Sequence, residues 1–122
     1  MGAAARQKRG SAAGTRRRQR THDIVFRALA DPTRREIISL LRERRRSVGE
    51  IASNFAVSRP AISKHLRLLR NAGLVVDHPE GTARVCELNA APLQQVDDWL
   101  DTYRSFWTHG LQRLKSYVER QT

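Results

Sequence analysis

The sequence predicts a mostly helical α+β fold in which a helix-turn-helix is followed by a small β-hairpin. Three observations predict it: a capping box at residues 47–50, a second amphipathic helix after a tight turn, and two short β-prone segments directly behind that helix. The chain has 122 residues, of which 39% are hydrophobic. That composition suffices for one compact domain with a buried core.

The first two helices are expected within residues 21–43. Apolar residues lie on nearly every side of the segment 21–29, so we expect a short helix buried on more than one face. Asp31 and Pro32 then start a second helix, because Asp accepts hydrogen bonds from free amides at an N-cap and Pro tolerates the first helical position. This helix directs four apolar side chains inward: Ile37, Ile38, Leu40 and Leu41.

The helix-turn-helix is expected over residues 47–73. The capping box opens a short helix that extends through Phe55, and a turn follows at residues 56–57. Ser58 caps the second helix, and Gly73 suits the left-handed position that terminates it. One face of this second helix is apolar (Ile62, Leu66 and Leu69), and the opposite face is polar and basic: Arg59, Ser63, Lys64, Arg67 and Arg70.

Two β-prone segments, residues 74–76 and 84–88, follow the second helix. The loop between them is expected to contain Pro79, Glu80 and Gly81. Their alternation of apolar and polar residues is imperfect, so periodicity alone does not establish a hairpin. In a winged helix-turn-helix, however, the wing is a β-hairpin that directly follows the second helix. The sequence therefore predicts a winged helix-turn-helix.

The last helix is expected to begin at Pro92 and to run to about Arg120. At 1.5 Å per residue it would be roughly 40 Å long, whereas a globule of about 100 residues has a radius of gyration of about 13 Å. The helix should therefore overhang its own core, and a second subunit is needed to cover its apolar stripe. Gly110 is the position at which it could bend or break. The stripe recurs at spacings of three and four: Leu93, Val96, Leu100, Tyr103, Trp107, Leu111, Leu114 and Val118.

Charge narrows the partner class. The formal net charge is +11, which indicates that the protein binds a polyanionic partner. Nucleic acid is favoured over an anionic membrane as that partner. We expect residues 1–20 to be a disordered basic tail, which is either a solvated tail without a specific role or an arm that contacts DNA phosphates. This tail holds seven bases and no acid: Arg6, Lys8, Arg9, Arg16, Arg17, Arg18 and Arg20.

The cellular location is expected to be the cytoplasm. Cys86 is the single cysteine, which excludes an intramolecular disulfide and suits a reducing compartment. No apolar run reaches membrane-spanning length. The early arginines precede no apolar signal core. We therefore expect no membrane partner.

Three stretches together resemble the ArsR/SmtB-type winged-helix repressors: ALADPTRREIISLL, SVGEIASNFAVSRPAISKHLRLLRNAGLV and EGTARVCEL. The resemblance covers about residues 22–90, and the closing DDWLDTYRSFWTHGLQRL looks like the subgroup without metal sites that includes SdpR-type autorepressors. It implies a repressor that binds a palindromic operator as a homodimer, with its recognition helices in successive major grooves. It also implies that the first and last helices form the interface, through Val25, Phe26, Leu29, Leu93, Val96, Leu100, Tyr103, Trp107, Leu111 and Leu114.

The partner expected from the residues themselves is double-stranded DNA. Arg59, Ser63 and Lys64 lie at i, i+4 and i+5 near the N-terminus of the second helix, the end that contacts base edges in helix-turn-helix proteins. Arg can bind guanine with two hydrogen bonds, and the matching positions face DNA in the family that the chain resembles. The alternative is a merely solvated helix face. The other expected contacts are Ser58, Pro60 through van der Waals contact, and Arg67, Arg70 and Arg84 to phosphate.

Metal or redox sensing is the alternative within this family. One sensor type carries paired cysteines on the first helix of the helix-turn-helix, and SVGEIASNF has none. Another sensor type uses Asp and His residues spaced along the last helix to bind the metal. Here His109 has no second His one turn away, and the residue two positions after Asp98 is Leu100 instead of His. Paired His109 residues with acidic partners across a dimer stay an alternative. We expect no metal or cofactor and no chemistry at Cys86.

Catalysis has little support in the sequence. There is no Gly-rich phosphate loop, no nucleophile elbow, and no Ser–His or Cys–His pairing at a recognisable spacing. We therefore expect neither an enzyme nor a small-molecule substrate. A winged-helix module that binds proteins is the competing class, and the basic second helix disfavours it.

Overall fold

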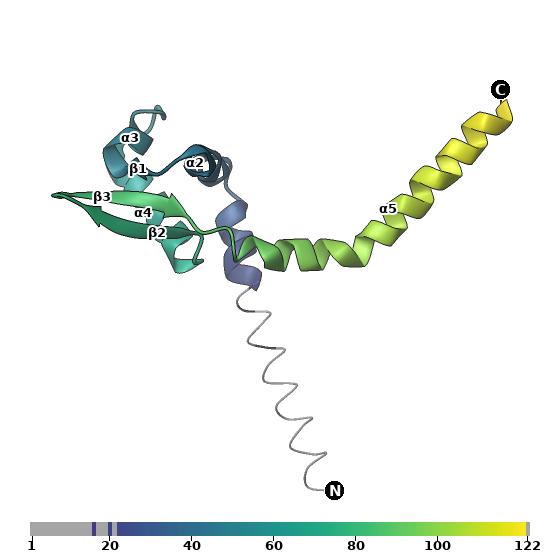
Figure 1. Ribbon diagram of the computed structural model, residues 1–122, viewed down its shortest axis with the longest axis horizontal. Coiled ribbons are helices and arrows are strands. Elements are labelled where there is room, and N and C mark those ends of the chain that lie inside the picture. The colour runs from purple at the N-terminus through teal and green to yellow at the C-terminus, as the bar shows by residue number, and fades with distance from the viewer. Residues whose placement is uncertain (1–15, 17–19, 21, 122) are drawn as a thin grey trace, which may run out of the picture.

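The computed structural model describes residues 16, 20 and 22–121, so the expected basic tail lies outside the described residues except at positions 16 and 20. A helix spans residues 22–29. It is followed by α2 (Pro32–Glu43), β1 (Arg46–Ser47), α3 (Val48–Ala52), α4 (Arg59–Asn71), β2 (Val75–Glu80), β3 (Ala83–Leu88) and α5 (Leu93–Gln121). The predicted winged helix-turn-helix is confirmed, with α2, α3, α4 and the sheet in one body and α5 extending away from it (Figure 1).

The predicted helix caps are present. Asp31 caps α2 by accepting a hydrogen bond from the Arg34 amide at 3.0 Å, and this bond holds the pKa of the Asp31 carboxyl below its ordinary value of 3.8. A carboxyl whose pKa falls on folding stabilises the fold above its ordinary pKa, and the contribution is lost as the pH falls through the lower value. Ser47 and Glu50 form the capping box of α3, and Ser58 caps α4.

The core lies where α2, α3, α4 and the sheet meet. Its largest fully buried members include Ile37 of α2, Ile51 of α3, and Ile62, Leu66 and Leu69, which are the predicted stripe of α4. At the end of α4, Gly73 adopts a φ of 75°, the left-handed conformation that favours glycine. This turn sends the chain from α4 into β2.

The sheet is larger than predicted, because β1 pairs antiparallel with β3 and gives the order β1-β3-β2. The two-residue β1 has no apolar alternation, so periodicity could not reveal it. The prediction that Pro79 and Glu80 belong to the wing loop is wrong, since both lie in β2 and pair with Arg84 and Ala83. Pro is tolerated there because β2 is an edge strand.

Helix α3 is shorter than predicted, and α5 is a single helix. The prediction that the α3 helix extends through Phe55 is wrong: it ends at Ala52, and turns and bends occupy residues 53–57. Helix α5 is continuous through Gly110, so that residue does not break it. No helix in the described part of the chain combines the length and the hydrophobicity of a membrane span.

Candidate nucleic-acid interface

The N-terminal half of α4 presents a polar, basic surface to solvent. Arg59, Ser63 and Arg67 are each exposed and follow one another at one-turn intervals, and exposed Lys64 lies beside them. None of these four side chains has a hydrogen-bonding or ionic partner among the described residues. Their donors are therefore available to an outside ligand.

Local sequence orients this surface. Ser58 accepts a hydrogen bond from the Ala61 amide at 3.3 Å, which fixes the start of α4, and Pro60 fits the first turn because it lacks an amide proton. The buried stripe on the opposite side holds α4 against α3 and α2. The packing of the buried face therefore determines which side chains of α4 point to solvent.

Arg70 differs from these four side chains, because it has an ionic partner within the chain. Its Nε lies 2.9 Å from Asp77 Oδ2 of β2, in an ion pair that is not aligned as a hydrogen bond, and its side chain is half-buried. The long side chain reaches the strand because β2 follows the sharp turn at Gly73. Arg70 therefore fastens α4 to the wing. Arg84 of β3 is exposed, as the sequence prediction requires.

The Cys86 thiol lies beneath this ion pair. Its Sγ donates to Asp77 Oδ1 at 3.5 Å, and the residue is fully buried. Burial, reinforced by the negative charge of Asp77, raises the pKa of the Cys86 thiol. Because the thiolate is the reactive form, the thiol should be inert at neutral pH.

Alkylation of the native protein by iodoacetamide at neutral pH should therefore be at least about tenfold slower than alkylation of the urea-unfolded chain, since unfolding removes the burial. Mass spectrometry of timed samples checks this, with free cysteine as the reagent control. Equal rates for the native and unfolded chains would contradict the inert assignment.

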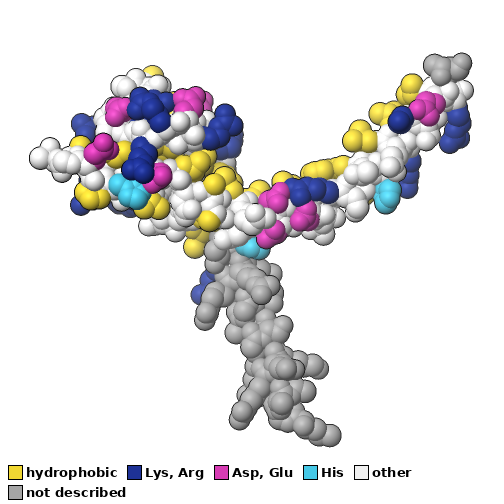
Figure 2. All heavy atoms as spheres, in the orientation of Figure 1, with side chains coloured by type: hydrophobic (Ala, Val, Ile, Leu, Met, Phe, Trp, Pro, Cys, Tyr) yellow, Lys and Arg dark blue, Asp and Glu magenta, His cyan; other side chains and the backbone are white. Residues whose placement is uncertain are grey.

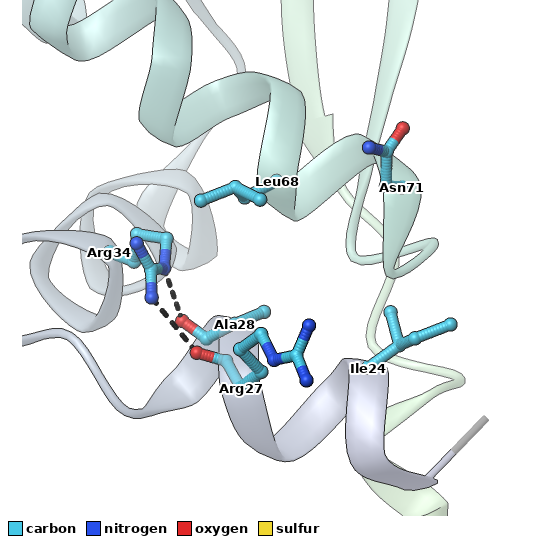
Figure 3. A pocket seen from close by; sticks show the side chains of 6 residues that line it. All are labelled: Ile24, Arg27, Ala28, Arg34, Leu68 and Asn71. Atoms are coloured by element: carbon cyan, nitrogen blue, oxygen red, sulfur yellow. Dashed lines mark hydrogen bonds between the residues drawn. The ribbon is translucent and has the colours of Figure 1, made fainter. Parts of the chain in front are cut away.

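A network centred on Arg34 connects the 22–29 helix with α4. Arg34 donates from Nε to the Ala28 carbonyl at 2.7 Å and from Nη2 to the Arg27 carbonyl at 2.9 Å, as Figure 3 shows. Its Nη1 lies 3.3 Å from His65 Nδ1 on α4, and that nitrogen is 3.8 Å from the Asp31 carboxylate. His65 is thus a hydrogen-bonded residue. The bonds of Arg34 follow a common pattern, since cations often bind the last carbonyls of a helix.

The adjacent Arg35 is a natural control for this network. It also donates to the end of the 22–29 helix, from Nη1 to the Leu29 carbonyl at 2.7 Å, but no bond joins it to α4. We expect Arg34→Ala to lower the free energy of unfolding by about 1–2 kcal/mol more than Arg35→Ala, because it removes several bonds and leaves His65 without its donor. Urea unfolding of both variants measures this difference. Equal losses would show that the link to α4 contributes nothing.

The expected dimer interface divides into two groups. Four predicted residues are occupied within their own chain: Val25 is 1% exposed, Leu29 and Leu93 pack against the core, and the Phe26 ring meets Trp99 edge-on at 5.5 Å. These contacts attach the 22–29 helix and the start of α5 to their own subunit. The remaining six are half-buried or exposed: Val96, Leu100, Tyr103, Trp107, Leu111 and Leu114.

The apolar side chains of α5 continue along the part of the helix that extends away from the core. Figure 2 shows hydrophobic side chains along the helix as far as its C-terminal part. Leu111 is 67% exposed and Leu114 is 59% exposed. Val118 of the predicted stripe is also exposed, as are the apolar side chains of Phe106 and Tyr117. A stripe this exposed needs a partner surface in water.

One acidic group in the described part of the chain has the spacing of a metal site: Asp97, Asp98 and Asp101. Arg104 forms ion pairs with Asp97 and Asp101, and its hydrogen bond holds the pKa of Asp97 below the ordinary value. Arg104 therefore offsets one of the three negative charges, and Asp98 accepts a hydrogen bond from Gln94. His109 is not a member of the group.

The chain is similar in sequence and in fold to known bacterial regulators. Residues 31–76 match the sequence profile of the bacterial regulatory proteins of the arsR family. The HTH-type transcriptional regulator Rv2034 of Mycobacterium tuberculosis is 45% identical over 102 residues, which span 84% of this chain and 92% of the relative. The transcriptional repressor SdpR of Bacillus subtilis is 41% identical over 76 residues, 62% of this chain and 84% of the relative. An ArsR-like transcriptional regulator from Rhodococcus sp. RHA1 superposes with a TM-score of 0.64 at 31% identity, covering 81% of this chain and 93% of that structure.

Proposed function

Because this chain belongs to the ArsR family and is a DNA-binding transcriptional regulator, we propose that it is a homodimeric repressor that reads a palindromic operator with α4. The family resemblance predicted from the sequence is confirmed. The observation that carries the proposal is the exposed face of α4, whose four polar or basic side chains have no partner in the described part of the chain.

Base reading is assigned to the first turns of α4. Arg59 supplies two parallel donors that match the O6 and N7 acceptors of guanine, and Ser63 and Lys64 extend the contact by one turn. Ser58 and Pro60 lie at the start of the helix, where they contact the DNA backbone or the edge of a base. Phosphate contacts from Arg67 and from Arg84 of the wing fix the register of the protein on the duplex. Arg70 is left out, because Asp77 already compensates its charge.

A palindromic operator is read by two copies of α4, and a dimer supplies them. The exposed apolar stripe of α5 supports a dimer. The half-buried Leu100 and the exposed Tyr103, Trp107, Leu111 and Leu114 lie on one side of the helix, so a second α5 can cover them all at once. In a two-fold dimer the two recognition helices repeat along the duplex, and the operator repeats with them. Repression is proposed because SdpR, to which the chain is similar, is a repressor.

Selection from a random duplex library, followed by footprinting, tests this proposal. We expect an inverted repeat whose half-sites are one helical turn apart, about 10–10.5 bp from centre to centre, or a multiple of that spacing. Recovery of a single unrepeated site, or of no consensus, would contradict the dimeric reader.

The basic segment 1–20 is proposed to add phosphate contacts. Its seven positive charges act through counterion release, which every DNA sequence offers equally. Deleting residues 1–20 should weaken binding to specific and random duplexes alike and make the slope of log affinity against log salt shallower, by about 0.9 for each phosphate that the segment neutralises. Fluorescence anisotropy across a salt series measures the slope. An unchanged slope would leave the segment without a role in binding.

A further inference from the structure

A small pocket lies between the 22–29 helix and α4, away from the DNA-facing end of α4. Its volume is about 210 Å³, and Figure 3 shows the six side chains around it. Three are apolar and three are polar: Ile24, Ala28 and Leu68, with Arg27, Arg34 and Asn71. The pocket therefore has an apolar wall built from two helices and a polar rim.

The rim carries unpaired donors and no acid. The Arg27 guanidinium and the Asn71 amide have no side-chain partners among the described residues. Arg34 also lines the pocket, but its three guanidinium nitrogens already face the Arg27 and Ala28 carbonyls and His65. Arg27 is thus the cation free to bind a ligand, and Arg34 adds positive potential behind it.

We propose that this pocket binds a small carboxylate that carries an aromatic or branched apolar group. The carboxylate accepts hydrogen bonds from Arg27, whose planar guanidinium can hold both oxygens, and the apolar group contacts Ile24, Ala28 and Leu68. The size fits: an apolar cavity of about 150 Å³ accommodates benzene, so about 210 Å³ holds one ring with its carboxylate.

Occupancy should alter DNA binding, which rests on the function proposed above. The pocket wall includes Leu68 of the recognition helix, and Arg34 at its edge is the residue that joins the 22–29 helix to that helix through His65. A ligand between the two helices changes how α4 sits on the 22–29 helix. Coupling is reciprocal, so DNA must then change the affinity for the carboxylate by the same factor.

Titration of the full-length protein with benzoate, followed through its amide NMR shifts, tests the site without DNA. We expect saturable shifts at Arg27, Ala28 and Leu68, with a dissociation constant of about 1 mM. Arg27→Gln should weaken benzoate binding about tenfold, whereas Arg35→Gln should not, because Arg35 does not line the pocket. Benzyl alcohol, the uncharged match, should bind the wild type and Arg27→Gln equally.

Three outcomes would overturn the site: no saturation by about 10 mM benzoate, equal affinities in wild type and Arg27→Gln, or shifts that follow protein concentration instead of ligand, which would mean that a second copy fills the pocket. The coupling is tested separately, by repeating the titration with the selected operator duplex bound. A change in benzoate affinity of at least threefold is expected. An unchanged affinity would overturn the coupling and leave the site standing.

Discussion

The double substitution Leu111→Glu and Leu114→Glu should convert the protein from a dimer to a monomer. Both side chains are more than half exposed in the single chain, so the change removes nothing from its own core. In the dimer each would bury a charge against the apolar stripe of the partner. We expect the dimer dissociation constant to rise at least about 100-fold, which corresponds to about 2.7 kcal/mol. Sedimentation velocity at several concentrations measures it.

A matched control lies on the same helix. Gln112 and Ser116 are exposed on the opposite side of α5, beside the polar residues His109 and Arg120. Gln112→Glu with Ser116→Glu adds the same two charges and should leave the dimer intact. The monomeric variant should also lose affinity for the selected operator, because only one recognition helix then binds. A wild-type monomer at high concentration, or dissociation of both double variants, would refute this interface.

Local sequence signals predicted the elements that position the candidate site. Asp31, Ser47 and Ser58 cap helices because their side-chain oxygens satisfy amides within three residues, and such a contact can be read from spacing alone. The buried stripe of α4 was predictable for the same reason, since i, i+4 and i+7 lie on one helix face. The fold class followed from these elements in order.

Long-range contacts escaped the sequence because they depend on where the chain returns. Arg70 and Arg67 look alike on a helix diagram, yet the turn at Gly73 brings Asp77 within 2.9 Å of Arg70 alone. The family resemblance placed Val25 at the interface, and a short helix with apolar residues on nearly every side does not show that its own chain buries this residue to 1% exposure. The role of Arg34 could not be predicted, because it depends on the end of the 22–29 helix lying against the middle of α4.

Base reading by Arg59 is the second large effect. Arg59→Lys keeps the positive charge but removes the planar fork of donors that fits guanine, whereas Arg59→Ala removes both. On the selected operator each variant should lose about 1–3 kcal/mol of binding free energy. On random duplex Arg59→Lys should bind like wild type, since phosphate attraction depends on charge. Arg67→Ala, two turns further along α4, should weaken both duplexes equally, as a phosphate contact does.

The ratio of operator affinity to random-duplex affinity in Arg59→Lys, measured across a salt series, tests most directly that the exposed face of α4 reads sequence. We expect this ratio to fall by about 5- to 150-fold relative to wild type, with the salt slope unchanged on both duplexes. A ratio equal to that of wild type, with the operator still bound at full affinity, would contradict it and make Arg59 a phosphate contact.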